Sequence, residues 1–318
     1  MAIARTSLPR RLPLRGIVCL VPITAVGVWV VRNWPVFASG GRDLLGANHY
    51  WLLAAVTVTG LGWVAVSCTR QGAVLEPLPA GRLLATQLAA SAANHLLPAG
   101  LGAGAVNLRF LRGCGIPLAR SSAALALYSL AESAGRVVLL LVLLAAFPDA
   151  LRLDALIPNG TGLLLASVAA GLVCSVLLAV TAVRPLRRIV RAFLDTALTD
   201  ARSLHAMPAR ALALWGGSLA FPALQAAGLV AVALALDVPV PVVHVAIAYL
   251  AATCVAAAVP TPGGIGSVDA ALVVALVTAG APVAVATSAV LGYRIVTVWL
   301  PLLPAALVLG VLVRRKVV

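Results

Sequence analysis

Charged residues are scarce in this chain: Asp, Glu, Lys and Arg make up 10% of its 318 residues, and nine of them are acidic. A soluble domain of this length would carry about 25% charged residues. The composition is 62% hydrophobic, and apolar runs long enough to cross a bilayer recur along the sequence. These runs do not alternate between polar and apolar residues as membrane β-strands would. We therefore predict an all-α polytopic membrane protein.

Residues that build metal sites, disulfides and hydrolytic sites are also few. The five cysteines are scattered, mostly within apolar runs and without CxxC spacing, and the four histidines are dispersed. The motifs HExxH and GxSxG are absent, and nothing resembles a Walker loop. We therefore expect no metal, no cofactor and no enzymatic activity.

Basic residues outnumber acidic ones, which gives a net charge of +14. They fall in loops and at helix ends, without the basic and aromatic surface that nucleic-acid binding requires. The pattern indicates membrane topology through the positive-inside rule. We therefore expect no nucleic-acid partner.

Apolar segments predict about six full transmembrane helices. The basic N-terminal stretch "MAIARTSLPRRLPLRG" precedes the first segment without a convincing cleavage site after it, so we expect a retained helix rather than a signal peptide. The predicted full spans are about 17–36, 50–68, 119–147, 162–183, 210–236 and 283–313.

Two further apolar segments, 83–112 and 243–279, are broken centrally by proline and glycine, in "LLPAGLGAG" and "VPTPGGIG". Each half has roughly 13–16 residues, about 20–24 Å of helix against a hydrocarbon core of about 30 Å. We therefore predict re-entrant broken-helix hairpins. With both hairpins re-entrant and both termini cytosolic, most of the 23 basic residues lie on the cytosolic side of an inner membrane.

The link 184–210 carries apolar residues at helical spacing, with four arginines largely off that stripe. This pattern is typical of an amphipathic helix on an anionic leaflet. A simple positive-inside anchor is an equally good interpretation.

The two breaks resemble each other. Pro98-x-Gly100-Leu101-Gly102 matches Pro262-x-Gly264-Ile265-Gly266 in order, and Tyr128 then matches Tyr293. Each half of the chain, 1–147 and 148–318, contains two spans, a hairpin and a long span, and three crossings separate the hairpins. We therefore predict an inverted-topology repeat, the architecture of alternating-access transporters. A duplication without a transport role is the alternative.

Four ionisable residues fall within the predicted spans and hairpins. Glu132 and Arg136 are four residues apart on one helical face and can pair with each other, or can line a polar pathway. Asp269 follows "PGGIG" in the first turn of a returning half-helix, where a carboxylate can cap the helix or meet a cationic headgroup. Arg294 suits either a phosphate contact or a salt bridge to Asp269.

These residues carry a resemblance to a known family. The stretch "PTPGGIGSVDAALV" with the later "LGYRIVTVWLPLLPAAL" resembles the C-terminal signature of the lysylphosphatidylglycerol synthase transmembrane-region family, the flippase-like domain proteins. The stretch "NHLLPAGLGAGAVNLRFLRGCG" followed by "AESAGR" is similar to its N-terminal half. The resemblance covers about 83–145 and 250–310. The acid is Asp269 where the family usually has glutamate, and Glu132 and Arg136 are not adjacent as in its commoner Glu-Arg pair.

The resemblance implies a flippase-like protein without the cytosolic synthase domain. We expect it to move an anionic or zwitterionic phospholipid, including an aminoacylated one, or a lipid-linked headgroup across the cytoplasmic membrane by alternating access. The alternative is a non-transporting scaffold or partner for an enzyme of envelope-lipid synthesis. Expected partners are a membrane phospholipid, with a separate lipid-modifying enzyme and a second copy of the chain as further candidates. The expected substrate-binding residues are Asn94, Pro98, Gly102, Glu132, Arg136, Pro262, Gly263, Gly264, Gly266, Asp269, Tyr293 and Arg294.

Overall fold

The computed structural model describes residues 44–96, 101–147, 199, 202–257 and 266–314. Within these ranges the chain is built from helices and their connecting turns, with no strand. The predicted spans 17–36 and 162–183, and most of the amphipathic link 184–210, lie outside the described residues.

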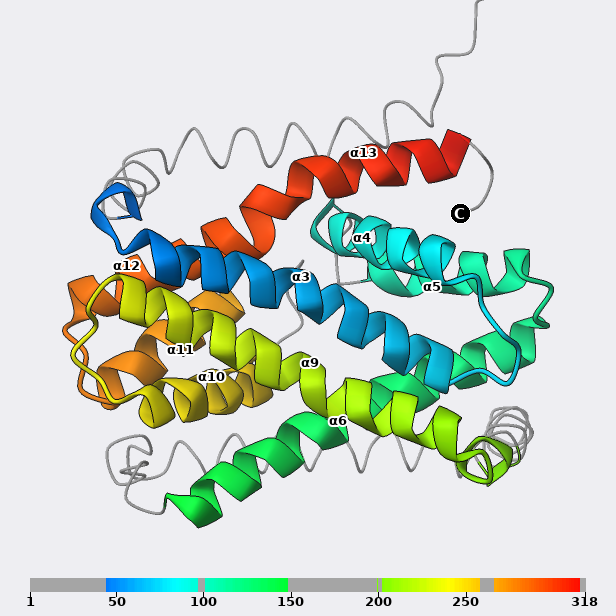
Figure 1. Cartoon of the computed structure of the whole chain (residues 1–318), viewed down its shortest axis with the longest axis horizontal. Helices are drawn as coiled ribbons and strands as arrows, with labels where there is room; N and C mark the ends of the chain where they lie inside the picture. The colour runs from blue at the N-terminus through cyan, green and yellow to red at the C-terminus, as the bar shows by residue number, and fades with distance from the viewer. Residues whose placement is uncertain (1–43, 97–100, 148–198, 200–201, 258–265, 315–318) are drawn as a thin grey trace, which may run out of the picture.

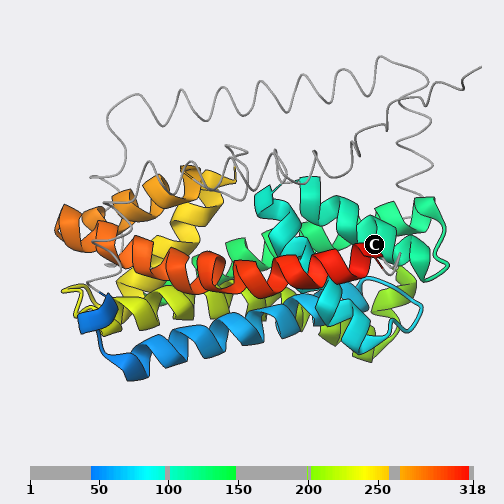
Figure 2. The ribbon, with the colours of Figure 1, turned by 90° about the horizontal axis from the view of Figure 1, so that it is seen from above.

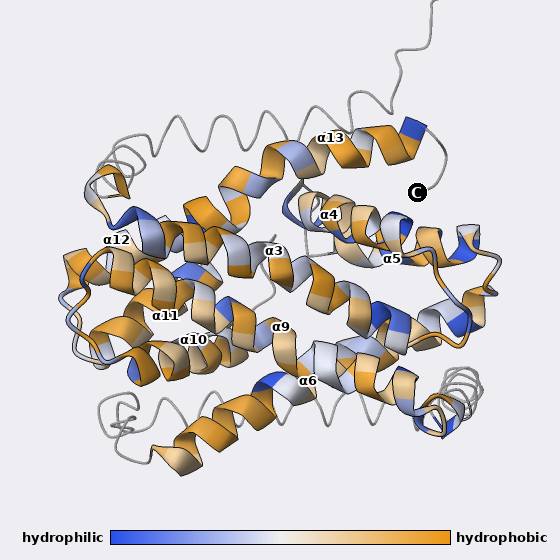
Figure 3. Ribbon diagram, in the orientation of Figure 1, coloured by the Kyte–Doolittle hydropathy of each residue, from blue (hydrophilic) through white to orange (hydrophobic). Residues whose placement is uncertain are grey.

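Four helices in the described part of the chain are long and apolar enough to cross a membrane: α3 (His49–Gly72), α6 (Leu118–Ala146), α9 (Pro208–Ala235) and the continuous helix Val283–Arg314. They correspond to the predicted spans 50–68, 119–147, 210–236 and 283–313. An all-α membrane protein is therefore confirmed. In Figure 3 the C-terminal half of α6 is uniformly hydrophobic, and hydrophilic residues occur near its middle.

Each broken segment forms two short helices that pack against each other. The first pair is α4 (Ala80–Leu96) with α5 (Leu101–Gly113), and the second is α10 (Val242–Ala256) with α11 (Ser267–Thr278). The two pairs lie on opposite sides of the molecule in both views (Figures 1 and 2). Neither helix of a pair is long enough to cross about 30 Å of hydrocarbon. Whether the pairs enter and leave the membrane on one side stays a prediction.

The turn after each pair has the same backbone geometry. Gly115 and Gly280 have φ angles of 87° and 108°, values that glycine adopts without steric cost. After each glycine the next residue's N–H returns to the preceding helix, from Ile116 to Leu111 O (3.2 Å) and from Ala281 to Leu276 O (3.0 Å). This bond pattern ends a helix in the Schellman motif.

The long helices α3 and α9 pack side by side along most of their length (Figures 1 and 2). Small residues allow this approach: a Cβ on Gly217 would lie 2.6 Å from Ala65 O and 2.8 Å from Thr69 N. Close contact of this kind is the main source of attraction between helices in lipid. The Arg210 side chain joins the same helices at one end, donating to Gln71 O (2.8 Å) and Leu75 O (3.1 Å).

The last span is not a uniform α-helix. Its first part, α12 (Val283–Arg294), passes through the π-helical turn η5 (Ile295–Trp299) into α13 (Leu300–Arg314). Pro301 lies two residues after the end of this turn. Proline has no backbone N–H, so within a helix it disrupts the regular pattern of backbone hydrogen bonds. The wider turn is the local adjustment, and such turns occur frequently at functional sites.

Buried apolar side chains form two clusters rather than one. One cluster gathers around α9 to α12 and includes Leu229, Tyr249 and Leu272. The other gathers around α4 to α6 and includes Phe110 and Tyr128. The space between these clusters is where polar residues collect.

Candidate functional site

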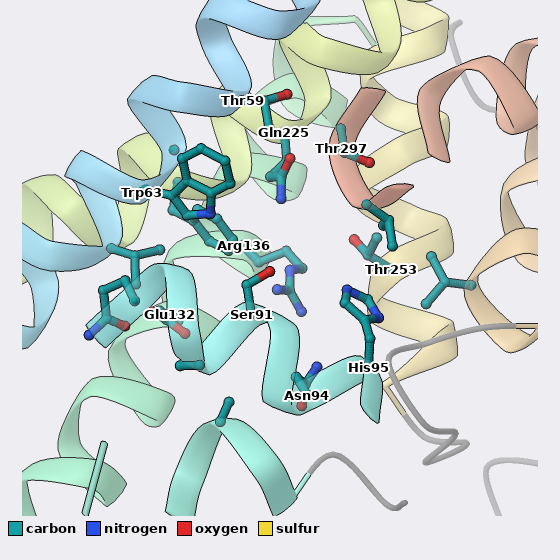
Figure 4. Close-up of a pocket in the computed structure, with 18 of the residues that line it drawn as sticks. Thr59, Trp63, Ser91, Asn94, His95, Glu132, Arg136, Gln225, Thr253 and Thr297 are labelled. Carbon is teal, nitrogen blue, oxygen red and sulfur yellow. The ribbon is translucent and has the colours of Figure 1, made fainter. Parts of the chain in front are cut away.

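A cavity of about 510 Å³ lies between the two helix pairs. Its walls come from α3, α4, α5, α6, α9, α10, the start of α11 and the last span. The labelled side chains in Figure 4 converge on it from α3, α4, α6, α9, α10 and the last span, and the guanidinium of Arg136 lies in the middle of the view. The volume falls within the range of about 300–1,000 Å³ that is typical of small-molecule sites.

Five of the predicted binding residues line this cavity: Asn94, Glu132, Arg136, Tyr293 and Arg294. The first three belong to residues 1–147 and the last two to residues 148–318, so the fold brings together residues that are far apart in the sequence. Three others lie beside it rather than on its wall: Gly102, Gly266 and Asp269. The remaining four lie outside the described residues: Pro98, Pro262, Gly263 and Gly264.

Glu132 forms an ion pair with Arg70 of α3. The side chains are 13% and 19% exposed for Arg70 and Glu132, respectively. The Arg70 guanidinium also lies over the ring of Tyr128, 3.4 Å from its centroid, a favourable cation–π arrangement. Of the two sequence interpretations, the Glu132–Arg136 pair is therefore not formed, and Arg70 neutralises Glu132 instead.

Asp269 combines two of its anticipated roles. Its Oδ2 accepts from the backbone N–H of Gly266 (2.9 Å), which caps the start of α11, and its Oδ1 pairs with Arg294 Nε. Both carboxylate oxygens are thus occupied by groups of the protein. The pair ties α11 to the last span at the point where η5 begins.

Arg136 has no ion pair or hydrogen bond with any residue in the described part of the chain. Its neighbour by sequence, Glu132, is committed to Arg70. A guanidinium stays charged at any physiological pH, and an uncompensated charge in a membrane-embedded cavity is costly. Arg136 is therefore the group on this wall that most needs an anion.

Hydrogen-bonding side chains without charge surround Arg136. Trp63, Ser91 and Gln225 lie on three different helices and line the cavity together with Asn94. Gln225 Oε1 accepts from the Tyr293 hydroxyl (3.1 Å), and the Tyr293 ring meets that of Tyr249 edge-on at 5.8 Å. The sequence had singled out Tyr293, and the structure gives it the role of orienting Gln225.

Three lining residues were missed at the level of sequence: Arg70, Trp63 and Gln225 had no assigned binding role. The predicted span ends at 68, which leaves Arg70 among the basic residues at helix ends and in loops, whereas α3 continues to Gly72. The signal that could have found it was Glu132, a buried acid that requires a cation. Gln225, an amide within a long apolar run, was a second available signal.

Gly102 serves packing between α4 and α5, because a Cβ there would collide with the backbone of Ala93. We expect Gly102→Ala to lower the free energy of unfolding by about 2 kcal/mol through overpacking. The change also displaces the neighbouring Asn94 from the cavity wall. Gly104→Ala is the matched control on the same helix, since nothing lies within 4 Å of its Cβ position. Unfolding in mixed SDS micelles measures both, and equal stability of the two variants would contradict this role.

Among the described residues, no group of three or more His, Cys, Asp or Glu is placed to hold a metal ion. The polar groups that line the cavity are mainly arginines, amides and hydroxyls, with one carboxylate, Glu132, and one imidazole, His95. Such groups bind oxygen-rich anions through charge-assisted hydrogen bonds.

Residues 17–305 match the family described as lysylphosphatidylglycerol synthase TM region. The match extends well beyond the two stretches that carried the resemblance, and it includes every element that lines the cavity. A search of curated proteins finds no match. The chain belongs to the lysylphosphatidylglycerol synthase TM region family and is a multi-pass membrane protein of this lipid-handling family.

Proposed function

We propose that this protein moves a phospholipid with an anionic or zwitterionic headgroup between the leaflets of the cytoplasmic membrane. The observation that carries the proposal is the arginine-containing cavity of about 510 Å³ between the helix pairs and the membrane-length helices. A headgroup that crosses a bilayer needs a polar surface to replace its water, and this cavity offers one. The proposed reaction forms and breaks no covalent bond.

Alternating access is the mechanism that we propose for this movement. The cavity lies between two broken helix pairs, and discontinuous helices next to a central site are typical of transporters that rock about it. The matching glycine turns at Gly115 and Gly280 are consistent with a repeat formed by 1–147 and 148–318. In the proposed cycle one pair moves away from the cavity to admit the headgroup and the other moves to release it.

The two ion pairs have a specific place in this cycle. Arg70–Glu132 joins α3 to α6, and Arg294–Asp269 joins α11 to the last span. Each pair holds one side of the cavity wall. A lipid phosphate that contacts Arg294 weakens its bond to Asp269, and the free energy of that exchange is available for moving α11.

Flipping in proteoliposomes tests the proposal. The purified full chain is reconstituted with a fluorescent phospholipid, and dithionite quenching measures its movement between leaflets. We expect the protein to accelerate movement over protein-free vesicles, and Asp269→Asn and Arg294→Gln each to lower the rate at least tenfold. Either change breaks the Asp269–Arg294 ion pair at the junction of α11 and η5.

The matched controls are Glu76→Gln and Arg120→Gln. These residues form an ion pair at 3.1 Å outside the cavity, with side chains about 40% exposed, so the same chemical changes there should leave the rate unaltered. Full flipping by both cavity variants would contradict the proposed site. No flipping of any envelope phospholipid by folded wild-type protein would favour the scaffold for a lipid-synthesis enzyme instead.

A further inference from the structure

The charges around the cavity do not balance within the described part of the chain. Three arginines line it, Arg70, Arg136 and Arg294, whereas two carboxylates stand beside them, Glu132 and Asp269. Each carboxylate is paired with one arginine. The wall therefore carries one guanidinium, that of Arg136, without a counter-ion among the described residues, and His95 adds no negative charge.

A cationic headgroup finds no free carboxylate on Asp269. Gly266 N–H and Arg294 Nε already hold its two oxygens. An amine approaching Glu132 must compete with Arg70, which has a guanidinium fixed over the ring of Tyr128. The amine would also lie near Arg136, and like charges in a site of low dielectric repel strongly.

Donor groups suited to a phosphate converge around Arg136. The Trp63 indole N–H donates only. Gln225 has its oxygen turned to the Tyr293 hydroxyl (3.1 Å), which leaves its NH₂ group free to donate. Asn94 and Ser91 complete this set on α4, and all four line the cavity with Arg136. An ammonium group only donates hydrogen bonds, so it cannot accept one from any of these N–H and O–H donors.

The same wall also presents acceptors that suit neutral hydroxyl groups. Thr59, Thr253 and Thr297 line the cavity, and each donates its own proton to a carbonyl one turn back, at 2.8, 2.9 and 2.7 Å. Their oxygen lone pairs remain available to a hydroxyl donor. A cavity of about 510 Å³ is also far larger than a phosphate group alone requires, so it has room for a hydroxylated substituent.

We propose that the cavity selects a phosphodiester headgroup that carries neutral hydroxyl groups and one net negative charge, and discriminates against headgroups that carry an amine. This inference rests on the proposed function and narrows its substrate class. Arg136 binds the phosphate, the amide and indole N–H groups add hydrogen bonds to it, and the threonine oxygens receive the hydroxyls. A cationic aminoacylated lipid is then a poor ligand of this chain.

Binding to the purified full chain tests the selection without requiring transport. Native mass spectrometry measures the affinity for phosphatidylglycerol, phosphatidylethanolamine and lysyl-phosphatidylglycerol at matched acyl chains. We expect phosphatidylglycerol to bind at least tenfold more tightly than either amine-bearing lipid. Arg136→Gln should lower the affinity for phosphatidylglycerol about tenfold and remove the preference for it. Arg136→Lys should retain part of the affinity and part of the preference, because lysine keeps the positive charge but loses the two-pronged hydrogen bonding of the guanidinium.

Arg120→Gln is the control, since it removes an arginine from outside the cavity. Equal or tighter binding of lysyl-phosphatidylglycerol by the wild type would overturn the inference, as would an undiminished preference in folded Arg136→Gln. Soluble sn-glycerol 3-phosphate distinguishes a site for a lipid headgroup from a site for a free glycerol phosphate, because both ligands carry a phosphate and hydroxyl groups. Displacement of phosphatidylglycerol by it supports headgroup recognition, whereas tight binding of glycerol phosphate without any binding of phosphatidylglycerol would overturn the lipid assignment.

The two proposals fail in distinguishable ways. Flipping of all three lipids at one rate would leave the proposed function intact and overturn the selectivity. Selective binding of phosphatidylglycerol without flipping would support the selectivity and overturn the transport function.

Discussion

Replacing Glu132 by glutamine should lower the free energy of unfolding by about 3 kcal/mol. The Arg70 side chain is 13% exposed and loses its counter-ion in this variant, and removing one partner of a buried pair typically costs about 3–5 kcal/mol. We expect a loss at the lower end of this range because the Glu132 side chain, at 19% exposed, keeps some access to the cavity. Unfolding in mixed SDS micelles measures the change.

A double-mutant cycle separates the pair from the individual side chains. Arg70→Gln and Glu132→Gln should each be destabilising, and the double variant should lose less than the sum of the two because no unpaired charge remains. The control cycle uses Arg120→Gln and Glu76→Gln, a pair about 40% exposed, where we expect a coupling below about 1 kcal/mol. Equal coupling energies in the two cycles would show that burial does not set the strength of the Arg70–Glu132 pair.

Replacing Gly217 by alanine should destabilise the protein by about 3 kcal/mol. The added Cβ would lie 2.6 Å from Ala65 O and 2.8 Å from Thr69 N, and both are backbone atoms of α3 that cannot rotate away. The two helices must therefore separate, and they lose contact along one of the longest interfaces of the fold. Overpacking of this kind costs about 1–3 kcal/mol or more.

Gly216→Ala provides the control for Gly217→Ala. The two glycines are neighbours on α9, and nothing lies within 4 Å of the Cβ position of Gly216. Alanine favours the helix over glycine by roughly 1 kcal/mol, so Gly216→Ala should be neutral or slightly stabilising. If Gly217→Ala were as stable as Gly216→Ala, close packing of α3 on α9 at this point would be refuted.

Helix type and approximate position were accessible from the sequence because they follow from local rules. Apolar runs of sufficient length predicted four helices that the structure contains, with ends within a few residues. Proline and glycine predicted the interruption of two further segments, and the structure has short helix pairs there. The end of α3 was placed too early, because Arg70 and Gln71 reduce hydropathy although the helix continues to Gly72.

The residues of the candidate site could be predicted only in part from the sequence. Glu132, Arg136, Asp269 and Arg294 were identified because charges are rare and costly in apolar segments. Trp63 was missed because an indole in an apolar helix carries no such signal, and Gln225 was missed because an uncharged amide there gives a weaker signal than a charge does. Trp63 and Gln225 belong to the candidate site because tertiary packing places them on the wall of the cavity beside residues of other helices.

The sequence by itself determined that this is an all-α membrane protein, that four of its charges lie in apolar segments, and where its helices break, because each follows from the composition of a short segment. Tertiary structure alone decided the partners. It joined Glu132 to Arg70 rather than to Arg136, and it gave Asp269 both a helix cap and an ion pair. Such choices depend on distances between helices far apart in the chain, and close packing of α3, α6 and α9 through small residues sets those distances. That packing also leaves Arg136 without an ion pair among the described residues, and the proposed selectivity depends on this.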